Sequence, residues 1–342
     1  MISRMFFALG MAALMLAPFS SCASGRAPAT GSATDGHRVP AAIAHAAAAS
    51  KPAAAQTHAS PAVSLANAFS GRQAYAYTRA VVDFGPRPPG SAAHRRMVAY
   101  ILANLRQDHA RIVQDRFTAH TPKGPMPENN IIAKFGPRTG QILVLCGHYD
   151  TKIEKFHFVG ANDGGSSTGL PLEAAAVLAK HPLQVPVWVV FLDGEEDVVH
   201  WTRTDGTYGS RQLAALWRTQ GVAPRIHALI LVDMIGDKNL DIGRETQSTQ
   251  WINDFVASAA EKLGYSKYFF QNSIAIEDDH LAFLHVGIPS VDLIDATYGP
   301  GNRNVFGRWW HSPRDTMDKL SPHSFRVVGR TVMQTLQMLA RQ

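Results

Sequence analysis

The sequence predicts an α/β fold in which a mixed, mainly parallel sheet lies between layers of helices. Three apolar segments carry this prediction, residues 142–147, 186–192 and 226–232. Each has the length of a buried strand, and the segments between them, 168–180 and 207–220, have the length and apolar content of helices. Strands that alternate with helices favour parallel pairing, because each helical crossover returns the chain to the same end of the sheet.

The other expected elements flank this core. Residues 112–120 and 129–135 predict an antiparallel pair of strands, separated by a turn rich in Pro and Gly at 121–127. The remaining elements are helices at 66–84, 91–107, 249–263, 279–286 and 322–340 and a strand at 289–294.

The first 62 residues are expected to precede the folded domain, which should span 63–342. Residues 1–23 combine a short positive start, an apolar run and small residues near the end, which is typical of a signal peptide. Export to the periplasm or the medium is therefore expected, with acylation at Cys22 as the alternative that would add a lipid anchor. Residues 24–62 are rich in Ala, Pro, Ser and Thr and predict a disordered linker.

Composition narrows the class of protein further. A chain of 342 residues with 46% hydrophobic residues can bury a large core. The net charge is +6, but Lys and Arg are scattered and form no basic stripe, so nucleic-acid binding is not expected. Cys146 is the only cysteine of the expected domain, so a metal there must be held by His and carboxylates.

Imidazoles and carboxylates follow the predicted strands at the point where each strand ends. The carboxyl ends of parallel strands meet at one edge of a sheet, so these side chains should lie close together. Asp163 stands in a Gly-rich turn before the helix at 168–180, where it could point between the strand ends or simply act as a turn or cap residue. The set predicts a zinc site and consists, in chain order, of His148, Asp163, Glu195, Glu196, Asp233 and His311.

The adjacent pair Glu195 and Glu196 carries most of the chemical prediction. Two neighbouring carboxylates repel each other unless a cation or a proton is present. One of them can bind the metal while the other acts as a general base. Asp150, two residues after His148, is expected to hold the imidazole nitrogen that does not face the metal.

This ordered set resembles the zinc aminopeptidase family, peptidase family M28, which also contains the animal-type glutaminyl-peptide cyclotransferases. The resemblance covers about residues 66–342 and implies a single zincin-like α/β/α sandwich with a zinc-dependent catalytic site. For the aminopeptidase branch it implies two zinc ions bridged by Asp163, with Glu195 as the base. The two remaining ligand pairs would be His148 with Asp233 and Glu196 with His311.

Four further segments resemble the cyclotransferase branch. They are Trp201 with Tyr208–Arg211, Leu231–Gly236, Glu277–Pro289 and Trp310–Asp315. In that branch one zinc ion is usual, which implies the ligands Asp163, Glu196 and His311. The catalytic groups implied are Glu195, Asp278 and Asp233, and the implied substrate-binding residues are Trp201, Trp310, Phe306 and Glu277. Position 277 departs from the animal pattern, which has Gln there.

The preferred prediction is a zinc-dependent glutaminyl-peptide cyclotransferase, which converts an N-terminal glutamine to pyroglutamate and releases ammonia. A dizinc aminopeptidase is the alternative, because the same ligands serve both branches. A binding module with a structural zinc ion is disfavoured, because a closed structural site has no use for the adjacent Glu195. The expected partners are peptide or protein N-termini, and the protein is expected to be a monomer.

Overall fold

A six-stranded sheet forms the centre of the protein in the computed structural model, which describes residues 64–303 and 306–342. The predicted signal peptide (1–23), the linker (24–62) and the expected first residue of the domain lie outside the described residues. Within the described ranges, no helix is both long and apolar enough to cross a membrane.

The sheet is mixed, as predicted. Its strand order is β1-β2-β4-β3-β5-β8. The pairs β4/β3, β3/β5 and β5/β8 are parallel, while β1/β2 and β2/β4 are antiparallel. The strands are β1 (Arg111–Thr121), β2 (Gly124–Phe135), β3 (Ile142–His148), β4 (Val187–Leu192), β5 (Ile226–Asp233) and β8 (Ser290–Ile294).

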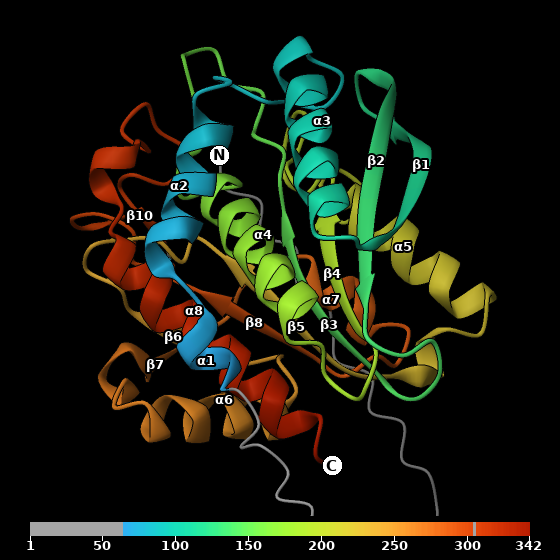
Figure 1. Cartoon of the computed structure of the whole chain (residues 1–342). Coiled ribbons are helices and arrows are strands. Elements are labelled where there is room, and N and C mark those ends of the chain that lie inside the picture. Colours follow the sequence, from blue (N-terminus) through green and yellow to red (C-terminus); the bar gives the residue numbers. More distant parts are fainter. Residues whose placement is uncertain (1–63, 304–305) are drawn as a thin grey trace, which may run out of the picture. The chain divides into compact units, whose positions relative to one another are not determined.

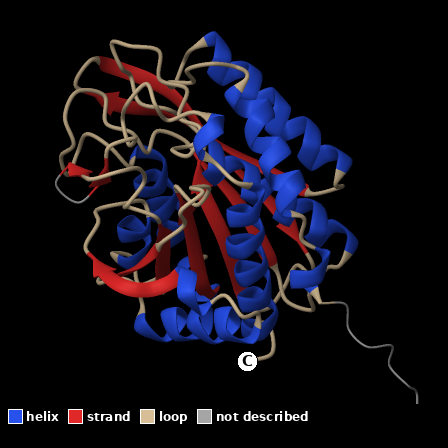
Figure 2. Cartoon of the chain, turned by 90° about the vertical axis from the view of Figure 1, so that its left-hand side faces the viewer, coloured by secondary structure: helices blue, strands red, loops and turns tan. Residues whose placement is uncertain are grey.

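Helices cover both faces of the sheet, so the predicted α/β/α sandwich is confirmed (Figures 1 and 2). Strand residues alternate between two cores: Leu143 and Leu145 of β3 face one core, whereas Val144 and Cys146 face the other. The first core is shared with α2 (Gly71–Val82), α3 (Ala92–Gln107), α4 (Gly165–Lys180), α6 (Gln250–Lys262) and α8 (Pro322–Leu339). The second is shared with α5 (Tyr208–Thr219) and α7 (His280–Leu284).

The structure differs from the sequence prediction at four places. The prediction of one helix at 66–84 is wrong, because the chain forms two helices there, α1 (Leu65–Ala68) and α2, with Ser64 and Ser70 as separate N-caps. The expected turn at 121–127 is too long, since β1 and β2 continue to a two-residue connection. Helix α4 starts at Gly165 rather than 168. The small sheets were not predicted, and they are formed by β6 (Ile242–Glu245) with β7 (Phe269–Ile274) and β9 (Asn302–Arg303) with β10 (Phe306–Gly307).

Helix α4 is the most buried helix of the first layer, and Gly169 allows α2 to approach it closely. A Cβ atom at Gly169 would lie 2.6 Å from the carbonyl oxygen of Ala74 and would also collide with the side chain of Thr78. Because both contacts belong to the packed helix α2, the chain cannot relieve them by a side-chain rotation alone.

Gly169→Ala is therefore expected to lower the free energy of unfolding by about 1–3 kcal/mol through overpacking. Chemical denaturation followed by circular dichroism would measure the change. Lys180→Ala in the same helix is the control, because Lys180 is exposed and its loss should change stability by less than about 0.5 kcal/mol. Equal stabilities of the two variants would contradict the proposed helix contact.

Candidate metal centre and pocket

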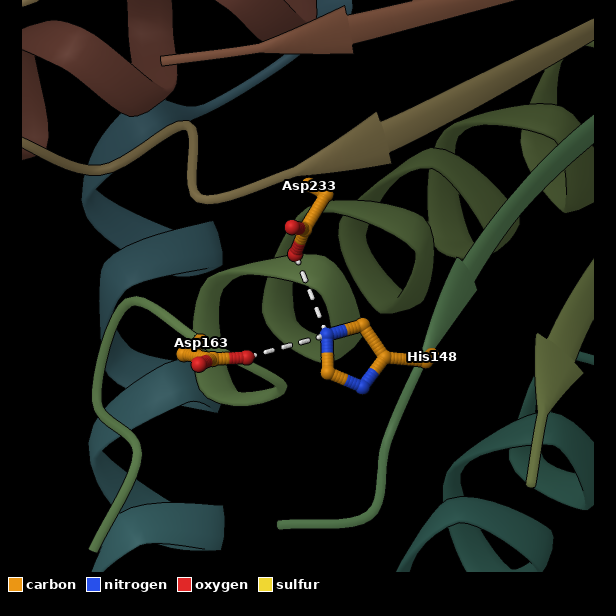
Figure 3. Close-up of side chains that lie close together, drawn as sticks. All are labelled: His148, Asp163 and Asp233. Atoms are coloured by element: carbon orange, nitrogen blue, oxygen red, sulfur yellow. Dashed lines mark hydrogen bonds and ion pairs between the residues drawn. The ribbon is translucent and has the colours of Figure 1, made fainter. Parts of the chain in front are cut away.

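The strand ends meet at one edge of the sheet, as predicted. His148 is the last residue of β3 and Asp233 is the last residue of β5. These strands pair in parallel, and β4, which pairs in parallel with β3, runs directly into Asp193–Glu196. Figure 3 shows His148 and Asp233 approaching each other from their two strands, with Asp163 entering from the loop before α4.

The turn that carries Asp163 is held by the carboxylate of Asp315. The backbone N–H groups of Asn162 and Asp163 donate to Asp315 Oδ1 and Oδ2 at 2.8 and 3.1 Å. Gly164 follows with φ = 77°, a conformation that favours glycine, and α4 begins at Gly165. Asp163 is thus placed by the backbone of its turn and is free to point between the two strand ends.

Asp163 is shared by two groups of side chains that could each hold a metal ion. In the first group, His148 Nε2 lies 3.3 Å from Asp163 Oδ1 and 3.1 Å from Asp233 Oδ1 (Figure 3). In the second group, His311 Nε2 lies 3.2 Å from both Asp163 Oδ2 and Glu196 Oε2. Thus the other four expected ligands lie around the Asp163 carboxylate.

The second group fits a metal ion by an independent criterion. Asp163 Oδ2 is buried, and no hydrogen bond reaches it among the described residues. Two ligand atoms that lie about 2.1 Å from a tetrahedral zinc ion are roughly 3.4 Å apart, close to the spacings around His311. The backbone at His311 has φ = 44°, a left-handed conformation that is uncommon for histidine and that recurs at functional sites.

The pKa values show how strongly these groups interact without a cation. Burial lowers the pKa of His311, but the charges of Glu196 and Asp163 outweigh it and raise the pKa to about 10. Burial likewise lowers the pKa of His148, yet its neighbouring carboxylates raise it well above its usual value. The imidazoles therefore occupy strongly negative surroundings, in which a metal cation would also be favoured.

Glu195 lies beside the ligand Glu196 and is held through its backbone. Asp150 accepts the N–H groups of Glu195 and Glu196 at 3.2 and 3.3 Å. Burial raises the pKa of the Glu195 carboxyl well above its usual value; His148 opposes this shift and Glu196 adds to it. A carboxylate of raised pKa near a metal site is suited to accept and return a proton.

Asp150 faces His148 as expected. Its Oδ1 lies 3.5 Å from His148 Nδ1, the ring nitrogen that points away from Asp163 and Asp233. The structure adds a second role, because the same carboxylate fixes the backbone of the Glu195–Glu196 segment. The residue spacing predicted the shared face with His148, but it could not show these hydrogen bonds to a distant segment.

A cavity of about 330 Å³ opens beside the second group and has the size of a small-ligand site. It brings together Trp201, Asp278, Phe306 and Trp310, which the resemblance had grouped. Trp310 stacks between Phe306 and His311, with ring centroids 4.1 and 3.8 Å away. Burial, with a contribution from Asp233, raises the pKa of Asp278 to about 6. The remaining described residues of the lining are Asp163, Glu195, Glu196, Asp197, Asp233, Met234, Ala275, Ile276, Glu277, Ile294 and His311.

Two supporting residues were not predicted. Ser167 donates its hydroxyl to Asp233 Oδ1 at 2.8 Å, and the N–H of Lys152 donates to Glu196 Oε1 at 3.1 Å. The Lys152 ammonium also contacts Asp197. Ser167 belongs to the Gly-rich stretch and could have been suspected, whereas the sequence holds no signal for Lys152.

Comparison with known proteins shows the family of this chain. Residues 130–336 match the model of peptidase family M28. Glutaminyl-peptide cyclotransferase of Drosophila melanogaster is 30% identical over 257 residues, which cover 67% of this chain and 70% of the fly protein. The chain therefore belongs to peptidase family M28.

Solved structures of both enzyme types are similar to this chain. The glutaminyl cyclase of an Acidobacteriales bacterium is 40% identical with a TM-score of 0.78, over 85% of this chain and 99% of that one. A leucine aminopeptidase precursor of Bacteroides thetaiotaomicron is 28% identical with a TM-score of 0.70, and the match covers 78% of this chain and 96% of that one. The glutaminyl cyclase of Porphyromonas gingivalis is 32% identical with a TM-score of 0.72, and the match covers 80% of this chain and 99% of that one.

His311→Ala is expected to release the metal, because it removes the nitrogen ligand of the second group and leaves the two buried carboxyl groups of Asp163 and Glu196 to repel each other. Metal content after gel filtration, measured by plasma mass spectrometry, would drop by at least tenfold. His285→Ala, which changes an exposed histidine of no assigned role, should retain the metal. Unchanged metal content in His311→Ala would exclude this residue as a ligand.

Proposed function

We propose that this protein is a glutaminyl-peptide cyclotransferase, which cyclises the N-terminal glutamine of peptides or proteins to pyroglutamate. One observation carries the proposal: Trp201, Asp278 and Trp310 line the same cavity as the group of Asp163, Glu196 and His311. The relatives and the most similar structures named above include glutaminyl cyclases, which supports this reading.

We further propose that one zinc ion is bound by Asp163, Glu196 and His311. When bound there, zinc would act as a Lewis acid toward the γ-carbonyl group of the substrate glutamine. The other group is less available, because Asp233 Oδ1 already accepts from Ser167 Oγ and from the N–H of Met234, each at 2.8 Å. A second ion bound through Asp233 Oδ1 would compete with these hydrogen bonds.

The reaction is an intramolecular acyl transfer. The α-amino nitrogen of the terminal glutamine forms a bond to its own γ-carboxamide carbon, and the bond from that carbon to the amide nitrogen breaks. Glu195 would accept a proton from the amine and deliver it to the departing ammonia. Since both reacting groups belong to one residue, a pocket that selects the folded-back conformation contributes much of the rate.

Asp278 and the aromatic walls would provide this selection. Asp278 is buried at the cavity, where it would hydrogen-bond the amide nitrogen of the substrate. Burial raises its pKa to about 6, so it could take up a proton during the reaction and share it with the leaving group. Asp233, whose charge contributes to that shift, would help to hold the proton. Trp201, Phe306 and Trp310 would enclose the side chain of glutamine and limit the access of water.

An aminopeptidase is the second candidate, and a specific observation favours it. The group of His148, Asp163 and Asp233 could hold another metal ion next to the first. Glu195 would then activate a water molecule for attack on the first peptide bond. We rank this function lower because of the hydrogen bonds on Asp233.

We also propose that the protein is exported through the predicted signal peptide and acts as a monomer. The positive start at residues 1–4 and the apolar run that follows support export. Both proposals are independent of the choice between the two reactions.

The first test is incubation of the purified protein, of measured zinc content, with a Gln-initiated and a Leu-initiated peptide, followed by mass spectrometry. The Gln peptide alone should lose about 17 mass units as ammonia, with about one zinc per chain, since cyclisation needs no second ion. Release of free leucine, with about two zincs per chain, would instead establish the aminopeptidase.

Glu195→Gln is expected to retain zinc and to reduce kcat by about 10²–10⁴-fold, because the amide keeps the shape of the side chain but cannot take up the proton. Steady-state assays with the Gln peptide and metal analysis would measure both effects. Glu261→Gln, an exposed site on α6, is the control and should leave kcat unchanged. Full activity of Glu195→Gln would remove its role as the base.

A further inference from the structure

The lining of the cavity is strongly acidic. Seven carboxyl groups line it, and none of the described residues of the lining is a lysine or an arginine. This contrasts with the whole chain, whose net charge is +6. Charged walls of one sign focus the local potential, so the cavity favours cationic groups over anionic ones.

Most of these seven carboxyl groups are already engaged. Asp163 and Glu196 belong to the proposed zinc ligands, and the ammonium group of Lys152 contacts Asp197. Glu195 is the proposed base, and both Asp233 and Asp278 are buried. Among the described acids of the lining, Glu277 alone is exposed, so its charge faces the solvent at the rim of the cavity.

Glu277 is held in place by Trp201. The indole Nε1–H of Trp201 donates to Glu277 Oε2 at 3.1 Å and links the loop after β4 to the loop before α7 across the rim. The indole packs against Gly206 and remains 37% exposed. An exposed aromatic ring with a carboxylate fixed at its edge is suited to bind a cation, because the ring face and the carboxylate attract it together.

We propose that Trp201 and Glu277 form a rim subsite that selects peptides with a lysine or arginine immediately after the terminal glutamine. This inference rests on the proposed function, since it requires the terminal glutamine to lie near the proposed zinc ligands Asp163, Glu196 and His311. The following residues of the peptide must then leave the cavity past the rim. A cationic side chain at this rim is attracted by the carboxylate of Glu277 and the indole of Trp201, whereas an acidic side chain is repelled by the carboxylate of Glu277.

The test compares three short amidated peptides, Gln-Lys, Gln-Ala and Gln-Glu followed by the same sequence. For each enzyme variant, kcat/KM of the two charged peptides is divided by that of the neutral Gln-Ala peptide. The unmodified enzyme should prefer the Lys peptide over the Glu peptide by roughly fivefold. The preference should decrease in 0.5 M NaCl, since salt screens exposed charges.

Glu277→Gln is the decisive variant, because it removes the charge and keeps an oxygen that can accept from Trp201. Its ratio between the Lys and Glu peptides should approach one. Glu154→Gln is the matched control, which removes a carboxylate outside the cavity lining and should keep the original ratio. An unchanged ratio in Glu277→Gln would overturn the subsite. Absence of pyroglutamate from the neutral Gln-Ala peptide would instead overturn the proposed function itself.

Discussion

The repulsion between buried carboxylates is the constraint on which the site depends. Asp163 is 3% exposed and lies 3.2–3.3 Å from two imidazole nitrogens, His148 Nε2 and His311 Nε2. Glu195, Glu196 and Asp233 crowd around the same point, and burial raises the pKa of both glutamates. Such a cluster is unfavourable unless positive charge balances it, so a metal ion held there would link the stability of the site to its chemistry.

Backbone hydrogen bonds to two further carboxylates resist this repulsion. Asp315 holds the turn that ends in Asp163, and Asp150 holds the segment that carries Glu195 and Glu196. Among the described residues, neither carboxylate belongs to a group of possible metal ligands, and both accept backbone N–H groups. The charged side chains are therefore positioned by rigid backbone, which is what a reaction that depends on orientation requires.

One ligand set is compatible with two reactions, and the surroundings distinguish between them. The two groups of possible metal ligands share Asp163, and both a leucine aminopeptidase precursor and glutaminyl cyclases are similar to this chain. The hydrogen bonds on Asp233 and the aromatic cavity favour cyclisation. The linked pair Trp201 and Glu277 adds an exposed carboxyl group at the rim of the cavity.

The sequence by itself determined the α/β class, the parallel strands and the residues at their ends, because apolar runs and strand ends are local features. It also placed Asp163 in a Gly-rich turn. Only the tertiary structure decided which carboxylate contacts which group: Asp150 holds the backbone of Glu195 in addition to facing His148, and Lys152 contacts Asp197. The split between α1 and α2 and the two small sheets also depended on packing. Such contacts join distant segments, and no local pattern encodes their competition for the same oxygen atoms.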